Sequence, residues 1–109
     1  MKINALKKMK DGWFVGDFYP RATESKEVEV SYKKHPKGEK WDTHYHEHVT
    51  ETNLLVRGEM IIQGKKLIAG DIFVLEPYEI ADPQFIEDCE IVCVKTPAIK
   101  NDKIVVIKQ

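Results

Sequence analysis

Residues 38–58 decide the fold, and they read GEKWDTHYHEHVTETNLLVRG, with three of the four histidines of the chain close together. In an extended strand, residues two apart point to the same face, so His44 and His46 present their imidazoles side by side. Glu51 has the opposite parity to His46, and it reaches the same side only if the chain bends or bulges near residues 48–50. Two imidazoles and a carboxylate suit Fe, Zn, Ni, Cu or Mn and leave coordination positions open. The stretch therefore predicts a transition-metal site.

The spacing of the fixed residues in this stretch is specific. Gly38 is followed by five residues, His44-x-His46, four residues, Glu51, six residues and Gly58. This arrangement resembles the first motif of the cupin superfamily, and the chain is similar to its small single-domain (cupin 2-like) members. The resemblance implies an all-β double-stranded β-helix, or jelly-roll barrel, with a site in its mouth. It also implies that His44, His46 and Glu51 bind a divalent metal such as Fe, Zn, Ni or Mn.

The second cupin motif is degenerate in this chain. The family pattern is Gly, five residues, Pro-x-Gly, two residues and a histidine that is the fourth ligand. Gly70 begins the pattern, but Ala81 stands at the position of the histidine, and an alignment shifted by one residue places Asp82 there. The metal could then use three protein ligands and water, or recruit Asp82 or His48. Loss of the metal is the remaining alternative.

The rest of the chain also favours an all-β fold. Short apolar segments separated by turn residues predict a sandwich or barrel. Residues 28–33 alternate apolar and polar side chains, so we expect Val28, Val30 and Tyr32 to face the core. Residues 5–10 are expected to form either a helical turn or an edge segment. The expected strands are residues 13–18, 28–33, 40–46, 52–57, 59–63, 65–68, 72–75, 89–95 and 103–107.

Composition excludes several classes of function. The chain has 109 residues with a formal net charge of −1, which predicts one domain over residues 1–109 and gives no basic excess for binding nucleic acid. No segment approaches the roughly 20 apolar residues of a membrane span. The N-terminus lacks the apolar core of a signal peptide. We therefore expect a cytoplasmic protein, with Cys89 and Cys93 as reduced thiols.

Four aromatic side chains are candidates to line a small-molecule pocket, since such pockets are concave and largely apolar. His35 precedes Pro36 in a lysine-rich segment, and we expect it to be solvated. Ordinary core packing is the alternative for each aromatic residue. The four candidates are Tyr32, Trp41, Tyr78 and Phe85.

The resemblance to cupins implies a metal-dependent enzyme that acts on a small polar or sugar-like molecule. The resemblance implies dioxygenase, isomerase or lyase chemistry without selecting among them. One alternative is a non-catalytic ligand-binding or sensing module. Another is a metal-free, RmlC-like sugar-nucleotide isomerase or epimerase, in which His44 and His46 would carry out acid–base chemistry with a tyrosine. We also expect a homodimer, paired through the strands near residues 13–18 and 28–32.

Overall fold

A computed structural model describes residues 1–107, which form eleven strands and one 3-10 turn, so the all-β prediction is confirmed. None of the described residues form a helix long and apolar enough to cross a membrane. The elements are η1 (Leu6–Lys8), β1 (Trp13–Gly16), β2 (Thr23–Glu24), β3 (Glu29–His35), β4 (His44–His46), β5 (Thr50–Arg57), β6 (Glu59–Ile62), β7 (Lys65–Ile68), β8 (Ile72–Leu75), β9 (Gln84–Phe85), β10 (Cys89–Thr96) and β11 (Lys103–Val105).

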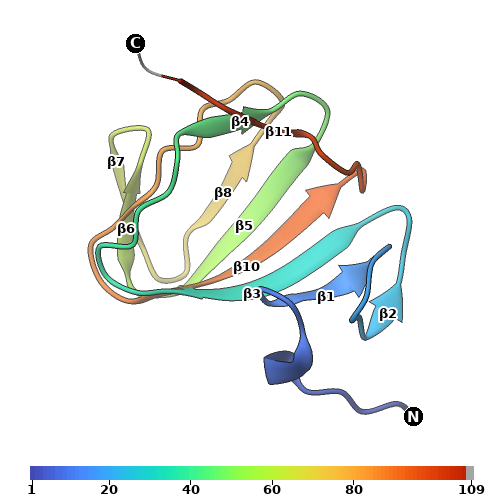
Figure 1. The fold of residues 1–109 in the computed structure, drawn as a ribbon. Helices are drawn as coiled ribbons and strands as arrows, with labels where there is room; N and C mark the ends of the chain where they lie inside the picture. The colour runs from blue at the N-terminus through green and yellow to red at the C-terminus, as the bar shows by residue number, and fades with distance from the viewer. Residues whose placement is uncertain (108–109) are drawn as a thin grey trace.

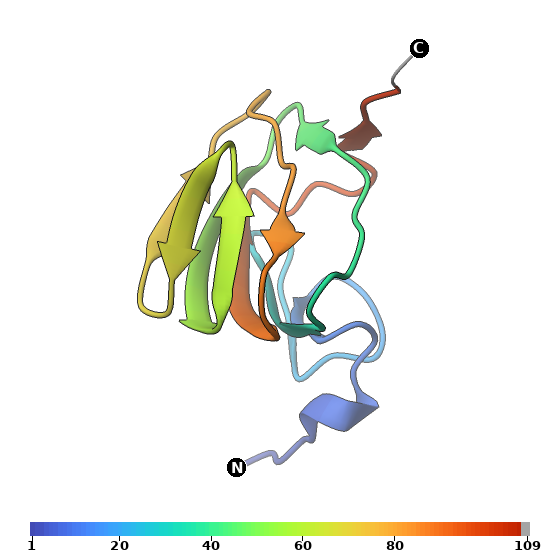
Figure 2. The ribbon, with the colours of Figure 1, turned by 90° about the vertical axis from the view of Figure 1, so that its left-hand side faces the viewer.

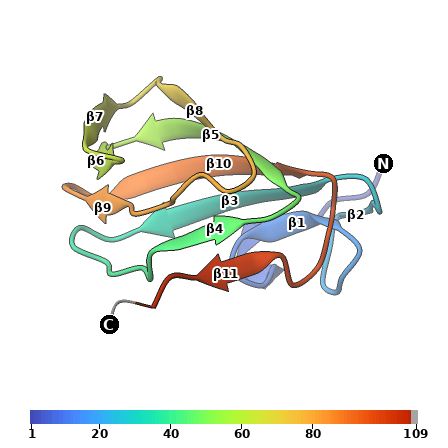
Figure 3. The same ribbon diagram turned by 90° about the horizontal axis from the view of Figure 1, so that it is seen from above.

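The strands form three sheets that surround a common interior (Figure 1). The largest sheet has the order β2-β1-β3-β10-β5-β8, and the smaller sheets have the orders β7-β6-β9 and β11-β4. Figure 2 shows β4 and β11 set across from the large sheet, and Figure 3 shows β4 beside β11 although they are far apart in sequence. The interior is therefore bounded by strands from opposite walls, and side chains from both walls meet there.

The apolar core fills one end of this interior. It lies between the large sheet and the β7-β6-β9 sheet, where inward-facing side chains of β5, β6, β8 and β10 meet. Trp41, Leu67 and Phe73 pack against it while remaining partly exposed. The buried members are Leu55, Met60, Ile62, Leu75, Ala81, Phe85, Cys89 and Ile91.

The strand expected at residues 40–46 is shorter than predicted, because only His44–His46 pair with β11. The preceding residues are held by side chains instead of a strand ladder. The Glu39 carboxylate accepts a hydrogen bond from Trp41 Nε1 at 2.7 Å and lies 2.6 Å from His35 Nδ1. Residues 47–49 then carry the chain from the β11-β4 sheet to the large sheet. This change of sheet brings Glu51 to the side of His46, where the sequence predicted a bend.

The inward face of β3 is the opposite of the one expected. Ser31 is 0% exposed and His35 is 8% exposed, whereas Val30 and Tyr32 are only half-buried. The prediction that the Val30 and Tyr32 face is the core face was therefore wrong. Apolar alternation misleads here because the inward face of β3 lines a cavity whose walls combine charged and polar side chains with members of the apolar core.

The expectation that His35 is solvated was also wrong. Its ring stacks on Phe85 with 4.4 Å between the ring centroids, and it lies at an edge of the Trp41 ring. Its Nδ1 atom contacts the Glu39 carboxylate. His35 is the last residue of β3, so the strand continues two residues beyond its predicted end and carries this side chain inward.

Candidate functional site

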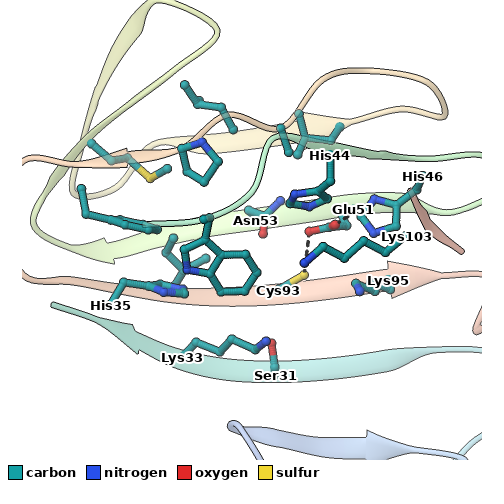
Figure 4. A pocket seen from close by; sticks show the side chains of 18 of the residues that line it. Ser31, Lys33, His35, His44, His46, Glu51, Asn53, Cys93, Lys95 and Lys103 are labelled. Atoms are coloured by element: carbon teal, nitrogen blue, oxygen red, sulfur yellow. Dashed lines mark hydrogen bonds and ion pairs between the residues drawn. The ribbon is translucent and has the colours of Figure 1, made fainter. Parts of the chain in front are cut away.

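The structure brings His44, His46 and Glu51 together inside the barrel (Figure 4). The two histidines are carried by β4 and the glutamate by β5, on opposite walls. One candidate ligand atom from each residue lies within 4.8 Å of the others. The two imidazoles are nearly perpendicular, with 5.4 Å between their centroids. These three residues, called the triad below, can hold one metal ion between them.

Neighbouring groups fix the orientation of each triad side chain. His44 Nδ1 lies 2.9 Å from the Asp42 carbonyl, which accepts a hydrogen bond from the Nδ1–H group and leaves Nε2 free to be a ligand. Glu51 Oε1 accepts a hydrogen bond from Cys93 Sγ at 3.3 Å, and its Oε2 lies 3.2 Å from His46 Nδ1. Burial, with the Glu51 charge next, raises the pKa of Cys93, so this thiol stays protonated and remains a donor.

The triad passes a direct test of fitness for a metal. His46 Nε2 is buried and has no hydrogen-bond partner among the described residues. Such an atom costs free energy unless something binds it, and an imidazole nitrogen is a common metal ligand. Burial is the main cause that lowers the pKa of both His44 and His46, which favours the neutral form that coordinates metals.

The structure keeps the weaker ligand candidates away from the triad. His48 is exposed, with its Nδ1 3.0 Å from Asp102, and the Asp102 carboxylate also accepts from the backbone N–H groups of His48 and Val49. Asp82 accepts a hydrogen bond from the Gln63 N–H at 2.7 Å. Neither His48 nor Asp82 belongs to the group that could hold an ion, so that group offers three candidate protein ligands.

The position of the missing fourth ligand adjoins the triad. Ala81 pairs with His44 as an antiparallel bridge, with N–H to carbonyl distances of 3.0 and 2.7 Å. Ala81 is 4% exposed and lines the cavity. Tyr78, which stands where the family keeps a glycine, has a left-handed φ of 70°. A turn is therefore present where the sequence predicted the second motif, and Ala81 occupies the position expected for its histidine.

Of the four aromatic candidates, the structure places two in the cavity. Trp41 and Phe85 line it. Tyr32 points to the other face of β3, where its hydroxyl donates to Glu90 at 2.7 Å. Tyr78 is 64% exposed and stacks on Tyr45.

Several cavity residues were not found from the sequence. The cavity has a volume of about 110 Å³. On the large sheet, Ser31 and Asn53 are the register partners of Cys93 on either side, so these three form one inward row. Ser31, Lys33 and His35 alternate along β3 and so share one face. Assigning that face to the interior would have identified Ser31. Among the cavity residues not predicted are Trp13, Ser31, Lys33, Asn53, Lys95 and Lys103.

Comparisons with solved structures identify the fold. A Klebsiella pneumoniae protein with a double-stranded β-helix domain matches with a TM-score of 0.67 and 22% identity, over 77% of this chain and 74% of that chain. A Bacteroides fragilis cupin protein matches with a TM-score of 0.53 and 20% identity, over 76% and 80% of the two chains. The Streptomyces protein Pac13, described as a nucleoside dehydratase, matches with a TM-score of 0.61 and 16% identity, over 75% and 70%.

The chain therefore has the cupin fold, and the predicted double-stranded β-helix is confirmed. No family model and no curated protein sequence matches the chain.

Proposed function

We propose that this protein is a divalent-metal-dependent enzyme that acts on a small polar molecule in the barrel cavity. The observation that carries the proposal is the buried triad of His44, His46 and Glu51, in which His46 Nε2 has no hydrogen-bond partner within residues 1–107. Two histidines and one carboxylate leave coordination positions open for a substrate or water. A metal held there would supply Lewis-acid polarisation of a substrate oxygen or activation of a water.

The residues of the chain have separate roles in this proposal. The Asp42 carbonyl and the Cys93 thiol orient two of the ligands, and Trp41 and Phe85 form an apolar wall beside them. A protein of the same fold, Pac13, is described as a dehydratase, which supports an enzyme of this architecture. The dioxygenase, isomerase and lyase classes stay open for this chain, as does the identity of the metal.

The metal-free isomerase alternative finds less support. That chemistry needs a tyrosine beside the histidines, and no tyrosine among residues 1–107 lines the triad cavity. The two tyrosines considered from the sequence, Tyr32 and Tyr78, lie outside it.

Elemental analysis of protein purified without chelators tests the proposal. We expect about one transition-metal ion per chain, lost in His44→Ala and in Glu51→Ala because each removes one of three ligands. His48→Ala is the matched control, since His48 is exposed and paired with Asp102, and it should retain the metal. A substrate screen with the identified metal follows, and activity should disappear on chelation and return with that metal. Full metal content in both triad variants would exclude this site.

A further inference from the structure

Three lysine side chains enter the triad cavity from three different strands (Figure 4). Lys33 is carried by β3, Lys95 by β10 and Lys103 by β11. Within residues 1–107, none of the three has a carboxylate within ion-pair distance. Glu51 is the only acidic side chain of that part of the chain that lines the cavity. A metal ion at Glu51 would add further positive charge to a cavity that is already basic.

Two tryptophans hold the lysine ammonium groups in place. Lys33 Nζ lies 4.8 Å from the ring centroid of Trp13 and 5.5 Å from that of Trp41. Lys95 Nζ lies 4.9 Å from the Trp13 centroid, and Lys103 Nζ lies 4.8 Å from the Trp41 centroid. Contact with an aromatic face positions an ammonium without neutralising it. The charges therefore remain available to a ligand.

Two neutral donors without partners face the same space. Ser31 Oγ and Asn53 Nδ2 are buried and have no hydrogen-bond partner among the described residues. Both belong to the inward row that passes through Cys93, with Lys33 two residues from Ser31 on the same face. A hydroxyl and an amide N–H₂ both donate to oxygen. Buried donors of this kind call for an acceptor that enters from outside the chain.

The lysines also repel one another. Burial, with the nearby Lys95 ammonium next, lowers the pKa of Lys33. An anion placed between the ammonium groups of Lys33 and Lys95 would offset both the burial and the repulsion, because an opposite charge favours the protonated form of a lysine. The whole chain has 17 basic and 18 acidic residues, so the positive charge of the cavity is local and not a consequence of composition.

We propose that the cavity binds a small organic acid, whose carboxylate or phosphate oxygens contact the ammonium groups of Lys33, Lys95 and Lys103. Donation from Ser31 and Asn53 would complete the anion site. The anion site itself does not require a metal. The inference rests on the proposed function only where it places the reacting part of the acid at the triad.

The size of the site limits this acid. The cavity, at about 110 Å³, is smaller than the roughly 300–1,000 Å³ typical of pockets for drug-sized ligands, so an acid of few carbon atoms fits it best. A wider hollow of about 600 Å³ adjoins it and shares Lys95 and Lys103, which gives room for the uncharged remainder of a longer acid.

Calorimetric titration at constant, low ionic strength tests the inference. The probes are acetate, malonate, succinate and inorganic phosphate, with malonamide as an uncharged analogue of malonate. Lys33→Met, Lys95→Met and Lys103→Met each remove one charge and keep most of the side-chain length. Lys34→Met is the matched control, because Lys34 is an exposed neighbour of opposite parity on β3. Lys103 is exposed, so Lys103→Met should fold and can test the inference even if Lys33→Met does not fold.

We expect at least one acid to bind saturably and malonamide not to bind. Each cavity variant should weaken that acid by roughly tenfold, the scale of one hydrogen bond to a charged group. Lys34→Met should stay within about twofold, as expected for an exposed charge. Comparison of carboxylates with phosphate identifies the acid group. Equal binding of malonamide, no binding of any acid, or unchanged affinity in all three cavity variants would overturn the inference.

The same samples separate this inference from the proposed function. Metal content is measured on each, and the titrations are repeated after chelation. Lysine-dependent binding of acid, together with no metal in protein purified without chelators, would uphold the anion site and refute the metal enzyme. Protein that holds metal at the triad but binds no acid would support the metal site and refute the anion site.

Discussion

Protonation of His44 and His46 should control metal binding at the triad, because an imidazole must be neutral to bind a metal. Burial lowers the pKa of both imidazoles from the ordinary value of 6.5, whereas the hydrogen bond to Asp102 raises the pKa of His48. Between the lowered values and 6.5 the folded chain binds fewer protons than the unfolded chain. Stability from these two groups is therefore present above pH 6.5 and is lost as the pH falls through their folded pKa values.

We expect metal affinity to hold from pH 8 to below 6.5 and to fall as the pH passes through the lowered pKa values of the two histidines, since the ligands must be deprotonated. Proton NMR of the imidazole signals in metal-free protein checks this directly. His44 and His46 should titrate below 6.5 and His48 above it. Titration of either triad histidine above 6.5 would contradict the role given to burial.

Ala81 offers a way to restore a four-ligand site. Its backbone is paired with that of His44, and its side chain faces the cavity. Ala81→His should tighten metal binding by roughly tenfold or more, comparable to the effect of the partners that orient metal ligands. Ala81→Phe fills similar space without a ligand nitrogen and is the control. Equal metal dissociation constants for the two variants, measured by competition with a chelator, would show that residue 81 does not reach the metal.

At the scale of elements, the turn between β5 and β6 depends on Gly58. This residue has a φ of +94°, and a Cβ atom there would lie 2.3 Å from the Asp88 carbonyl oxygen, a contact with backbone that cannot move aside cheaply. Gly64, in the next turn, has a φ of +72° and nothing within 4 Å of such an atom. Both glycines thus have a positive φ, but only Gly58 has neighbouring atoms where a Cβ atom would lie.

Gly58→Ala should therefore cost more stability than Gly64→Ala. The second change carries only the left-handed penalty of about 1–2 kcal/mol, whereas the first adds the clash with residue 88 and should exceed about 3 kcal/mol. Urea denaturation of both variants gives the comparison. Equal losses of stability in the two variants would mean that the backbone at residue 88 moves aside at little cost. Gly58 would then be needed only for its positive φ.

The sequence predicted elements well where one stretch of chain contains the whole pattern. The His44-x-His46 pair, Glu51 and Gly58 belong to one segment, and β7 and β8 match their expected ranges. The short strands β2 and β9 were missed, because two residues show no periodicity. Element boundaries that depend on side-chain contacts, such as the start of β4 after Glu39, were also missed.

The basic half of the site was unpredictable for a different reason. Lys33, Lys95 and Lys103 share a cavity only because β10 pairs between β3 and β5 and because β11 crosses to pair with β4. Neither pairing leaves a local signal in the chain. Asp102 is a similar case, since it supports residues 48 and 49 from more than fifty positions away. A lysine in a strand is predicted to face solvent unless the order of the strands in the sheet is known.

At the scale of the molecule, the triad joins two walls that are otherwise separate sheets. His44 and His46 belong to the β11-β4 sheet and Glu51 to the six-stranded sheet. The predicted pairing of two copies through the strands near residues 13–18 and 28–32 stays a prediction, and sedimentation velocity tests it. The described fold in any case supplies all three candidate ligands from one chain.

Metal binding should therefore stabilise the whole barrel. The ligands meet only in the folded chain, so a metal at 100 times its dissociation constant adds about 2.7 kcal/mol. For a domain near 100 residues that raises the melting temperature by roughly 10–20 °C. The rise should depend on metal concentration in the wild type and in Lys34→Met, and be absent in Glu51→Ala, where the two walls no longer share a complete ligand set. A rise that persists in Glu51→Ala would mean that the metal stabilises the fold from elsewhere and that the triad does not link the two sheets.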